Sequence, residues 1–141
     1  FADAKEQVFE DGMESDFSRN LSEFIMSYGQ LAMEAIIDII LANRVNTEVI
    51  SETLRILGRI HHKSTYRERL WILERCLLYS PFARVRDGAI LGLAFLDDPL
   101  AIEPLKSAIE RERIPELRED MEQVLAQLEG NKDDISTEKD S

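Results

Sequence analysis

A pair of short helices joined by a tight corner can be read directly from residues 81–109 of this 141-residue chain. Pro81 marks the start of the first helix, because proline is favoured in the first helical turn. Asp98 and Pro99 mark the corner and the start of the second helix by the same rule, with the aspartate as cap. Weaker copies of the first helix lie on either side of this pair. A unit that recurs along a chain predicts a stacked array, in which each unit buries its apolar face against its neighbours.

Three apolar stripes show the repeat. Each stripe has the spacing of one face of a helix, and no segment shows the strict alternation typical of a strand. Successive stripes are offset by 36 and then 32 residues, and Arg86 coincides with Arg118 at the second offset. The sequence therefore predicts an all-α chain. The three stripes are Val49, Leu57 and Ile60, then Val85, Leu93 and Leu96, then Leu117, Leu125 and Leu128.

Caps and breakers divide the chain into about seven expected helices. Gly29 is suited to end a helix, and Asn46 or Thr47 is suited to cap the start of one. Thr65 with Glu68 matches a capping box, and Ser80 precedes the proline noted above. The expected ranges are 17–28, 30–42, 48–60, 65–79, 81–96, 98–113 and 115–130.

Three regions follow from this division. Residues 1–14 form an acidic lead-in, and residues 15–130 form the repeat domain. The last helix is expected to end at Gly130. Residues 131–141 have almost nothing apolar to bury, so they are expected to be a disordered acidic tail.

The clearest unit carries a recognisable residue pattern, which is Pro81, Val85, Arg86, Ala89, Gly92 and Leu93, followed by Asp98, Pro99, Ala101, Ile102 and Leu105. This pattern resembles a HEAT-like repeat, of the phycobilin-lyase-type HEAT repeat group. The resemblance implies a short right-handed α-solenoid of antiparallel helix pairs, in a class whose members are mostly binding scaffolds. It also implies that Arg86 and Asp87 tie neighbouring repeats together.

Charge is unevenly distributed along the chain. The net charge of −11 disfavours general binding to nucleic acid. Residues 55–87 nevertheless carry 8 basic and 3 acidic side chains, between two segments of net charge −8 each. No apolar run is long enough to suggest a membrane span. Cys76 is the single cysteine, so we expect no internal disulfide and a cytoplasmic, reducing location.

The basic middle segment provides the candidate binding residues. Arg67, Trp71 and Arg75 follow one another at intervals of four, so they share one face of a helix. Such a ridge suits carboxylates or phosphates, with the indole as a flat anchor. The alternative is that the arginines pair with acidic residues of flanking helices and Trp71 packs between repeats. The candidate partner-binding residues are Arg55, Arg59, Lys63, Arg67, Trp71, Arg75 and Arg84.

The helix expected over 30–42 is apolar around almost its whole circumference. Only Gln30, Glu34 and Asp38 form a thin polar stripe. Either neighbouring helices and the lead-in bury it, or an exposed strip binds a partner or a second copy of the chain.

No motif indicates chemistry. His61 and His62 are adjacent and so diverge, which disfavours a metal site. Gly88 and Gly92 are expected to let two helices approach closely. No nucleophile with an obvious base and no phosphate-binding loop is present, so we expect no enzyme activity and no cofactor.

The sequence therefore favours a non-catalytic HEAT-like protein–protein interaction module. Its partner is expected to be a protein, bound mainly at the basic ridge. An acidic neutralising partner of a basic protein, as an antitoxin is, stays open as an alternative. Nucleic-acid binding on a basic concave face and a bilin-lyase-like enzyme are disfavoured by the overall charge and the short chain.

Overall fold

The computed structural model describes the backbone of residues 16–42 and 46–140, and the side chains of these residues up to Asn131. Within these ranges the chain is helical, with short connections and no strand. The expected lead-in over 1–14 lies outside the described residues. The first helix spans residues 16–28. It is followed by α2 (Gln30–Leu41), α3 (Thr47–Arg59), α4 (Tyr66–Tyr79), α5 (Ala83–Leu96), α6 (Ile102–Arg111) and α7 (Pro115–Asp140).

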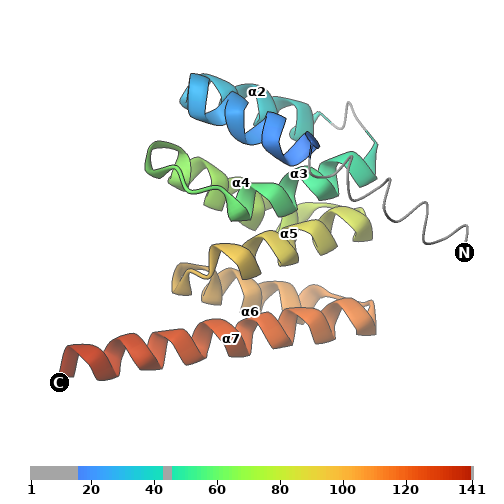
Figure 1. Ribbon diagram of the computed structural model, residues 1–141. Coiled ribbons are helices and arrows are strands. Elements are labelled where there is room, and N and C mark those ends of the chain that lie inside the picture. The colour runs from blue at the N-terminus through green and yellow to red at the C-terminus, as the bar shows by residue number, and fades with distance from the viewer. Residues whose placement is uncertain (1–15, 43–45, 141) are drawn as a thin grey trace, which may run out of the picture.

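The helices stack in chain order, from α2 at the top of Figure 1 to α7 at the bottom. Alternate helices touch, so that α3 contacts α5 and α5 contacts α7, while α2 contacts α4 and α4 contacts α6. Consecutive helices also meet, as α4 does with both α3 and α5. One continuous core runs between the helices, and its fully buried members include Ile25, Leu54, Leu73, Leu93 and Leu105.

Three of the expected boundary signals are confirmed. Gly29 ends the first helix with a positive φ of 54°, a conformation that glycine adopts without steric cost. The Asn46 side chain accepts a hydrogen bond of 2.8 Å from the amide of Val49 and so caps α3. The Asp98 carboxylate accepts one of 2.9 Å from the amide of Leu100 and opens the short 3₁₀ turn Pro99–Ala101 before α6.

The expected capping box at Thr65 is wrong. Thr65 precedes α4, but its side chain makes no capping hydrogen bond. Its hydroxyl oxygen instead accepts a 3.1 Å hydrogen bond from Nε of Arg69 and lies 3.0 Å from Nδ1 of His62. Glu68 likewise does not complete the box, because its buried Oε2 has no hydrogen-bond partner among the described residues. A 3₁₀ turn over Lys63–Thr65 leads into α4 instead.

Two other boundaries differ from the expectation. Helix α5 begins at Ala83 rather than at Pro81, and Ser80 Oγ accepts a 3.3 Å hydrogen bond from the amide of Phe82 just before it. Helix α7 continues past Gly130 to Asp140, through residues that the sequence predicts to be disordered. Gly130 does not adopt the positive φ that ends a helix, and no proline follows to interrupt the hydrogen bonding.

Helices α3 and α5 meet backbone to backbone, as the spacing of Gly88 and Gly92 predicts. A Cβ added to Gly88 would lie 2.5 Å from the carbonyl oxygen of Ser51, and one added to Gly92 would lie 2.5 Å from that of Leu54. A third glycine, Gly58 on α3, faces the carbonyl oxygen of Gly92 at 2.0 Å from its would-be Cβ. Glycine is therefore required on both helices of this contact.

Helix α2 buries one side and exposes the other. Ala32, Met33, Ile36 and Ile40 are buried, which confirms the packing part of the expectation. An apolar strip stays exposed among the described residues, with Leu31 71% accessible. No described helix combines the length and apolar character needed to cross a membrane.

Candidate functional site

Four side chains on α4 and α6 form an exposed run of alternating aromatic and cationic groups, which we call the cation–π run. The Arg75 guanidinium lies 5.6 Å from the ring centre of Trp71 and 5.5 Å from that of Tyr79. Arg111 lies at the end of α6, and its guanidinium is 5.6 Å from the ring centre of Tyr79. Trp71 and Tyr79 are 46% and 61% exposed, so the run lies on the surface.

The spacing along α4 explains the run. Residues four apart lie one above another on a helix, so Arg67, Trp71, Arg75 and Tyr79 follow one face. All four are exposed. No carboxylate among the described residues pairs with the two arginines of this helix face or with Arg111. Trp71 is about half covered and half open to solvent, so it is not fully buried between helices.

Two hollows lie beside the cation–π run, and Tyr79 lines the first of them. The first, of about 150 Å³, lies between α2, α4 and the start of α5, and its walls include Ile40, Leu41, Arg75 and Pro81. The second, of about 260 Å³, lies between α4 and α6, and its walls include Leu78, Ala108, Arg111 and Arg113. The first hollow is mainly apolar and contains Arg75, whereas the second is mainly polar and contains Arg111, so each includes an arginine of the cation–π run.

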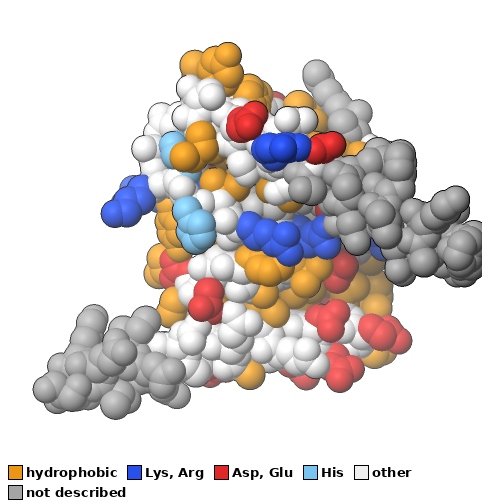
Figure 2. Space-filling view, in the orientation of Figure 1, with side chains coloured by type: hydrophobic (Ala, Val, Ile, Leu, Met, Phe, Trp, Pro, Cys, Tyr) orange, Lys and Arg blue, Asp and Glu red, His pale blue; other side chains and the backbone are white. Residues whose placement is uncertain are grey.

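The remaining candidate residues do not join this run. Arg59 lies against α5, with its guanidinium 4.1 Å from the ring centre of Phe95. Arg55 pairs with Glu52 one turn away on α3, and Arg84 pairs with Glu48 across 3.2 Å. Figure 2 shows Lys and Arg side chains above a hydrophobic patch between α3 and α5. The seven predicted residues therefore lie on two faces. Arg67, Trp71 and Arg75 are on α4, and Arg55, Arg59 and Arg84 are on α3 and α5. Lys63 lies in the turn between α3 and α4.

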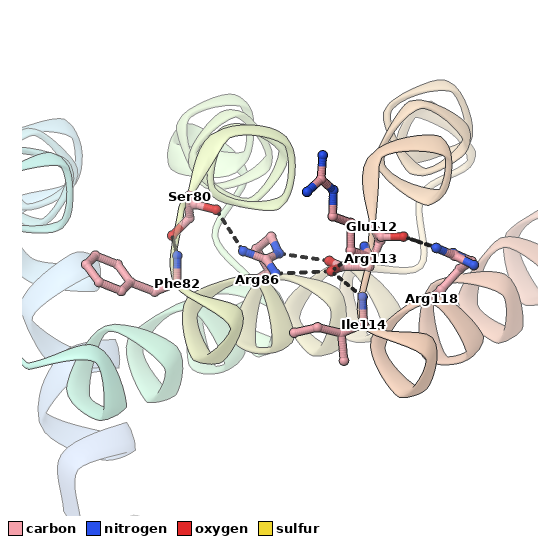
Figure 3. Close-up of polar contacts among 7 residues, drawn as sticks. All are labelled: Ser80, Phe82, Arg86, Glu112, Arg113, Ile114 and Arg118. Carbon is pink, nitrogen blue, oxygen red and sulfur yellow. Dashed lines mark hydrogen bonds and ion pairs between the residues drawn. The ribbon is translucent and has the colours of Figure 1, made fainter.

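Arg86 ties two corners together, as the resemblance implied. Its guanidinium donates to both carboxylate oxygens of Glu112, at 2.8 and 3.1 Å, and to the backbone oxygen of Ser80 at 3.0 Å (Figure 3). Glu112 also accepts hydrogen bonds from the amides of Arg113 and Ile114, at 3.1 and 3.2 Å. Since Glu112 is only 4% exposed, these donors are what make its burial tolerable.

The charge state of Glu112 follows from these contacts. Burial by itself raises the pKa of a carboxylate, but the hydrogen bonds from Arg86 and from the backbone of Ile114 outweigh it, so the pKa of Glu112 is lowered. Asp87 behaves differently, because burial and the nearby Asp120 raise its pKa against the opposing effect of Arg84.

A second buried arginine closes the corner after α3. Arg69 is 1% exposed. It donates to the carbonyl oxygens of Leu57, Ile60 and His62 at 3.0, 2.6 and 2.7 Å. A cation is favourable at the C-terminal end of a helix, which explains why an arginine is used here. Burial lowers the pKa of Arg69, while Tyr66 and Glu68 act in the opposite direction.

The structure offers no metal centre in the parts of the chain that it describes. His62 contacts Thr65, and His61 lies at the adjoining corner. Cys76 is buried, and burial raises the pKa of its thiol to about 11 against a small opposite effect of Arg75. A thiol with so high a pKa is a poor nucleophile at neutral pH.

No family model, curated protein or solved structure matches this chain. The candidate site therefore rests on its own geometry.

Sequence reasoning missed two members of the cation–π run. Tyr79 continues the four-residue spacing of Arg67, Trp71 and Arg75, so the signal was present in the sequence. Arg111 had no such signal, because it reaches Tyr79 only through the packing of α6 on α4.

Proposed function

We propose that this chain is a non-catalytic protein–protein interaction module built from HEAT-like repeats, and that the cation–π run contacts its partner. The observation that carries the proposal is an exposed row of two aromatic rings and two arginines that spans two helices without a carboxylate partner in the described part of the chain. Tryptophan, tyrosine and arginine are the residues that most often dominate binding energy at protein interfaces.

We infer a short right-handed α-solenoid of antiparallel pairs from features that recur at the sequence intervals. Arg86 donates to the carbonyl of Ser80 and Arg118 donates to that of Glu112, so each arginine reaches back six residues to the residue that ends the preceding α4 or α6. Both α4 and α6 are also preceded by a single 3₁₀ turn, over Lys63–Thr65 and Pro99–Ala101. Repeated corners of this kind support stacking of equivalent units.

The partner is expected to present carboxylates beside one or two apolar side chains. The carboxylates would pair with Arg67, Arg75 and Arg111, which are exposed cations in a chain of net charge −11. The apolar side chains would fill the hollow that Tyr79 lines, between α2, α4 and the start of α5. Charge complementarity then sets orientation and association rate, while the buried anchors set residence time. We assign the module to the cytoplasm, for which a buried, unpaired Cys76 is suitable.

Comparing charge-reversal variants on the two basic faces tests this proposal. The wild-type chain, Arg75→Glu and Arg84→Glu are each used to capture proteins from a lysate of the source cells. We expect specific proteins to be retained by the wild type and by Arg84→Glu and to be lost with Arg75→Glu. Both arginines are exposed, so neither change should unfold the chain.

A retained protein is then purified and titrated against the chain. Isothermal titration calorimetry gives the affinity of every variant, including one that lacks Trp71, the only tryptophan of the chain. We expect Trp71→Ala to weaken binding about 30-fold, as is typical for a central aromatic anchor. Equal retention by the wild type and both charge-reversal variants, or unchanged affinity of Trp71→Ala, would place the contact elsewhere and refute the proposed face.

An acidic neutralising role is the second candidate function. Figure 2 shows Asp and Glu side chains grouped over α7. The acidic residues exposed along this helix are Glu116, Glu119, Asp120, Glu122 and Glu129. If this face binds a basic protein, as an antitoxin does, Glu119→Lys should abolish capture of a basic partner while Arg75→Glu leaves it intact.

A second copy of the chain is a further candidate partner, through α2. Leu31, Ile39 and Leu41 are exposed on that helix at 71, 42 and 46%. Light scattering tests this, because a dimer should become a monomer when Leu31 and Ile39 are both changed to glutamate. A monomeric wild type would exclude it.

A further inference from the structure

The corner between α3 and α4 encloses a pocket that is separate from the cation–π run. It has a volume of about 310 Å³, at the lower end of the range in which small molecules bind. The end of α3, the connection to α4 and the end of α5 form its walls. Six side chains in these walls carry its chemistry, and they are His61, His62, Lys63, Tyr66, Arg69 and Phe95.

Four of the nine lining residues carry basic side chains, and no carboxylate belongs to the lining. Lys63 and His61 are exposed and have no partner among the described residues. His62 uses Nδ1 in its contact with Thr65, which leaves Nε2 without a partner in the same part of the chain. Asp98, outside the lining, accepts hydrogen bonds from the hydroxyl of the lining residue Tyr66 and from the amide of Leu100.

Arg69 places a buried charge at the back of this pocket. Its hydrogen bonds go to three carbonyl oxygens and to the Thr65 hydroxyl, and none goes to a carboxylate. Glu68 acts on it only through space. Carbonyl oxygens satisfy the N–H groups of a guanidinium but do not neutralise its charge. An anion in the pocket would therefore gain from Arg69 and Lys63 in a site partly shielded from water, against the opposing charge of Asp98 at Tyr66.

The opposite wall is aromatic. Phe95 is 44% exposed, and the guanidinium of Arg59 lies 4.1 Å from its ring centre, which adds another cation at the rim. Gly58 and Leu96 complete an apolar surface beside the ring. The pocket thus combines a flat apolar wall with a group of cationic and N–H donors.

We propose that this corner pocket binds an aromatic phosphate monoester, with the phosphate toward Lys63, His61 and His62 and the ring against Phe95. Phosphate is preferred to a carboxylate because a monoester has three terminal acceptor oxygens and a charge of about −1.5 to −2, against two oxygens and a single charge. Phenyl phosphate is a compound of a size that the cavity can enclose. The pocket shares no residue with the cation–π run, so this proposal is tested separately from the proposed partner contact.

Titration of the full chain with phenyl phosphate tests the proposal, followed by the shifts of backbone amides in two-dimensional NMR spectra. We expect saturable shifts at residues 58–66 and 95–96, no saturation with phenol, and weaker binding of inorganic phosphate. A phosphotyrosine pentapeptide is titrated in parallel. Tighter binding of the peptide would assign the phosphate to a protein side chain, and tighter binding of phenyl phosphate would assign it to a small molecule.

Two variants and a control distinguish the site from a general charge effect. Lys63→Gln should weaken phenyl phosphate about tenfold, the value expected for one charge-assisted hydrogen bond. Phe95→Ala should reduce it to the affinity of inorganic phosphate. Lys106→Gln removes the same charge on α6, where Lys106 lies 3.7 Å from Glu103, and should have no effect. Absent saturation, equal effects of the two lysine variants, or no effect of Phe95→Ala would each overturn the proposal.

Discussion

The contact between α3 and α5 gives the sharpest prediction about stability. The perturbation is Gly58→Ala, which adds one methyl group where the two helix backbones meet. Its Cβ would lie 2.0 Å from the carbonyl oxygen of Gly92, whereas ordinary contact begins at 3.4 Å. The neighbouring atoms are backbone, which cannot rotate away, so the helices must separate by roughly 1.4 Å.

The cost can be worked from the side chains on either side of this contact. Leu54, Leu57 and Leu93 are all fully buried there. Burial of each stabilises the fold by about 1.5–3 kcal/mol, and a gap of about 0.5–1 Å loses roughly a quarter to a half of the attraction between facing atoms. Residual strain adds about 1–3 kcal/mol, and the better helix propensity of alanine returns about 1 kcal/mol. The net destabilisation is roughly 3 kcal/mol.

Urea unfolding followed by circular dichroism measures this change. Thermal unfolding followed by the same signal should show the melting temperature fall by about 12 °C, at about 4 °C per kcal/mol for a chain of this length. Gly130→Ala is the matched control, because a Cβ there meets nothing within 4 Å and the residue lies inside α7. It should stabilise the chain by about 0.5 kcal/mol. If Gly58→Ala is as stable as the wild type within about 0.5 kcal/mol, the backbone contact is wrong.

Three further predictions concern single buried groups. Because the pKa of Glu112 is lowered in the folded chain, its carboxylate stabilises the fold above its ordinary pKa of 4.5, and this stabilisation is lost as the pH falls through the folded value. Glu112→Gln should therefore cost about 3 kcal/mol at pH 7, with the difference from wild type shrinking below about pH 4 in urea titrations; a constant difference would contradict it. Arg69→Met should cost about 3 kcal/mol by the same measurement, since it leaves carbonyl oxygens at the end of α3 unsatisfied, and a neutral result would refute their dependence on Arg69. Burial raises the thiol pKa of Cys76 to about 11, so at pH 8 it should react with a thiol reagent only as fast as the folded chain opens. If the folded chain is labelled as fast as the chain unfolded in urea, Cys76 is accessible and this prediction is wrong.

The helices were predictable because most of their signals are local. Asn46 and Asp98 bond to amides two or three residues away, so their roles can be read from neighbouring positions. The capping box at Thr65 failed for a non-local reason, since the hydroxyl accepts from Arg69 on the next turn while that arginine reaches back to α3. A sequence window does not contain the competition between these partners.

The candidate site was predictable to the same extent. The intervals of four between Trp71, Arg75 and Tyr79 indicate a common face, because they lie on one helix. Arg59 was grouped with them through its charge, although packing directs it toward Phe95 on α5. Arg111 joins the run only because α6 lies against α4. Proximity between helices is what the sequence alone lacks.

The glycine contact also determines how stiffness is distributed along the stack. At α3 and α5 the two helices touch through their backbones, and bending there would compress atoms that have no side-chain freedom. Helices α4 and α6 are in contact but contain no glycine, so side chains, which can change rotamer as the helices shift, separate their backbones. When the stack bends, the distance between α4 and α6 should therefore change more than the distance between α3 and α5. A partner that contacts both α4 and α6 would therefore restrict this bending when it binds.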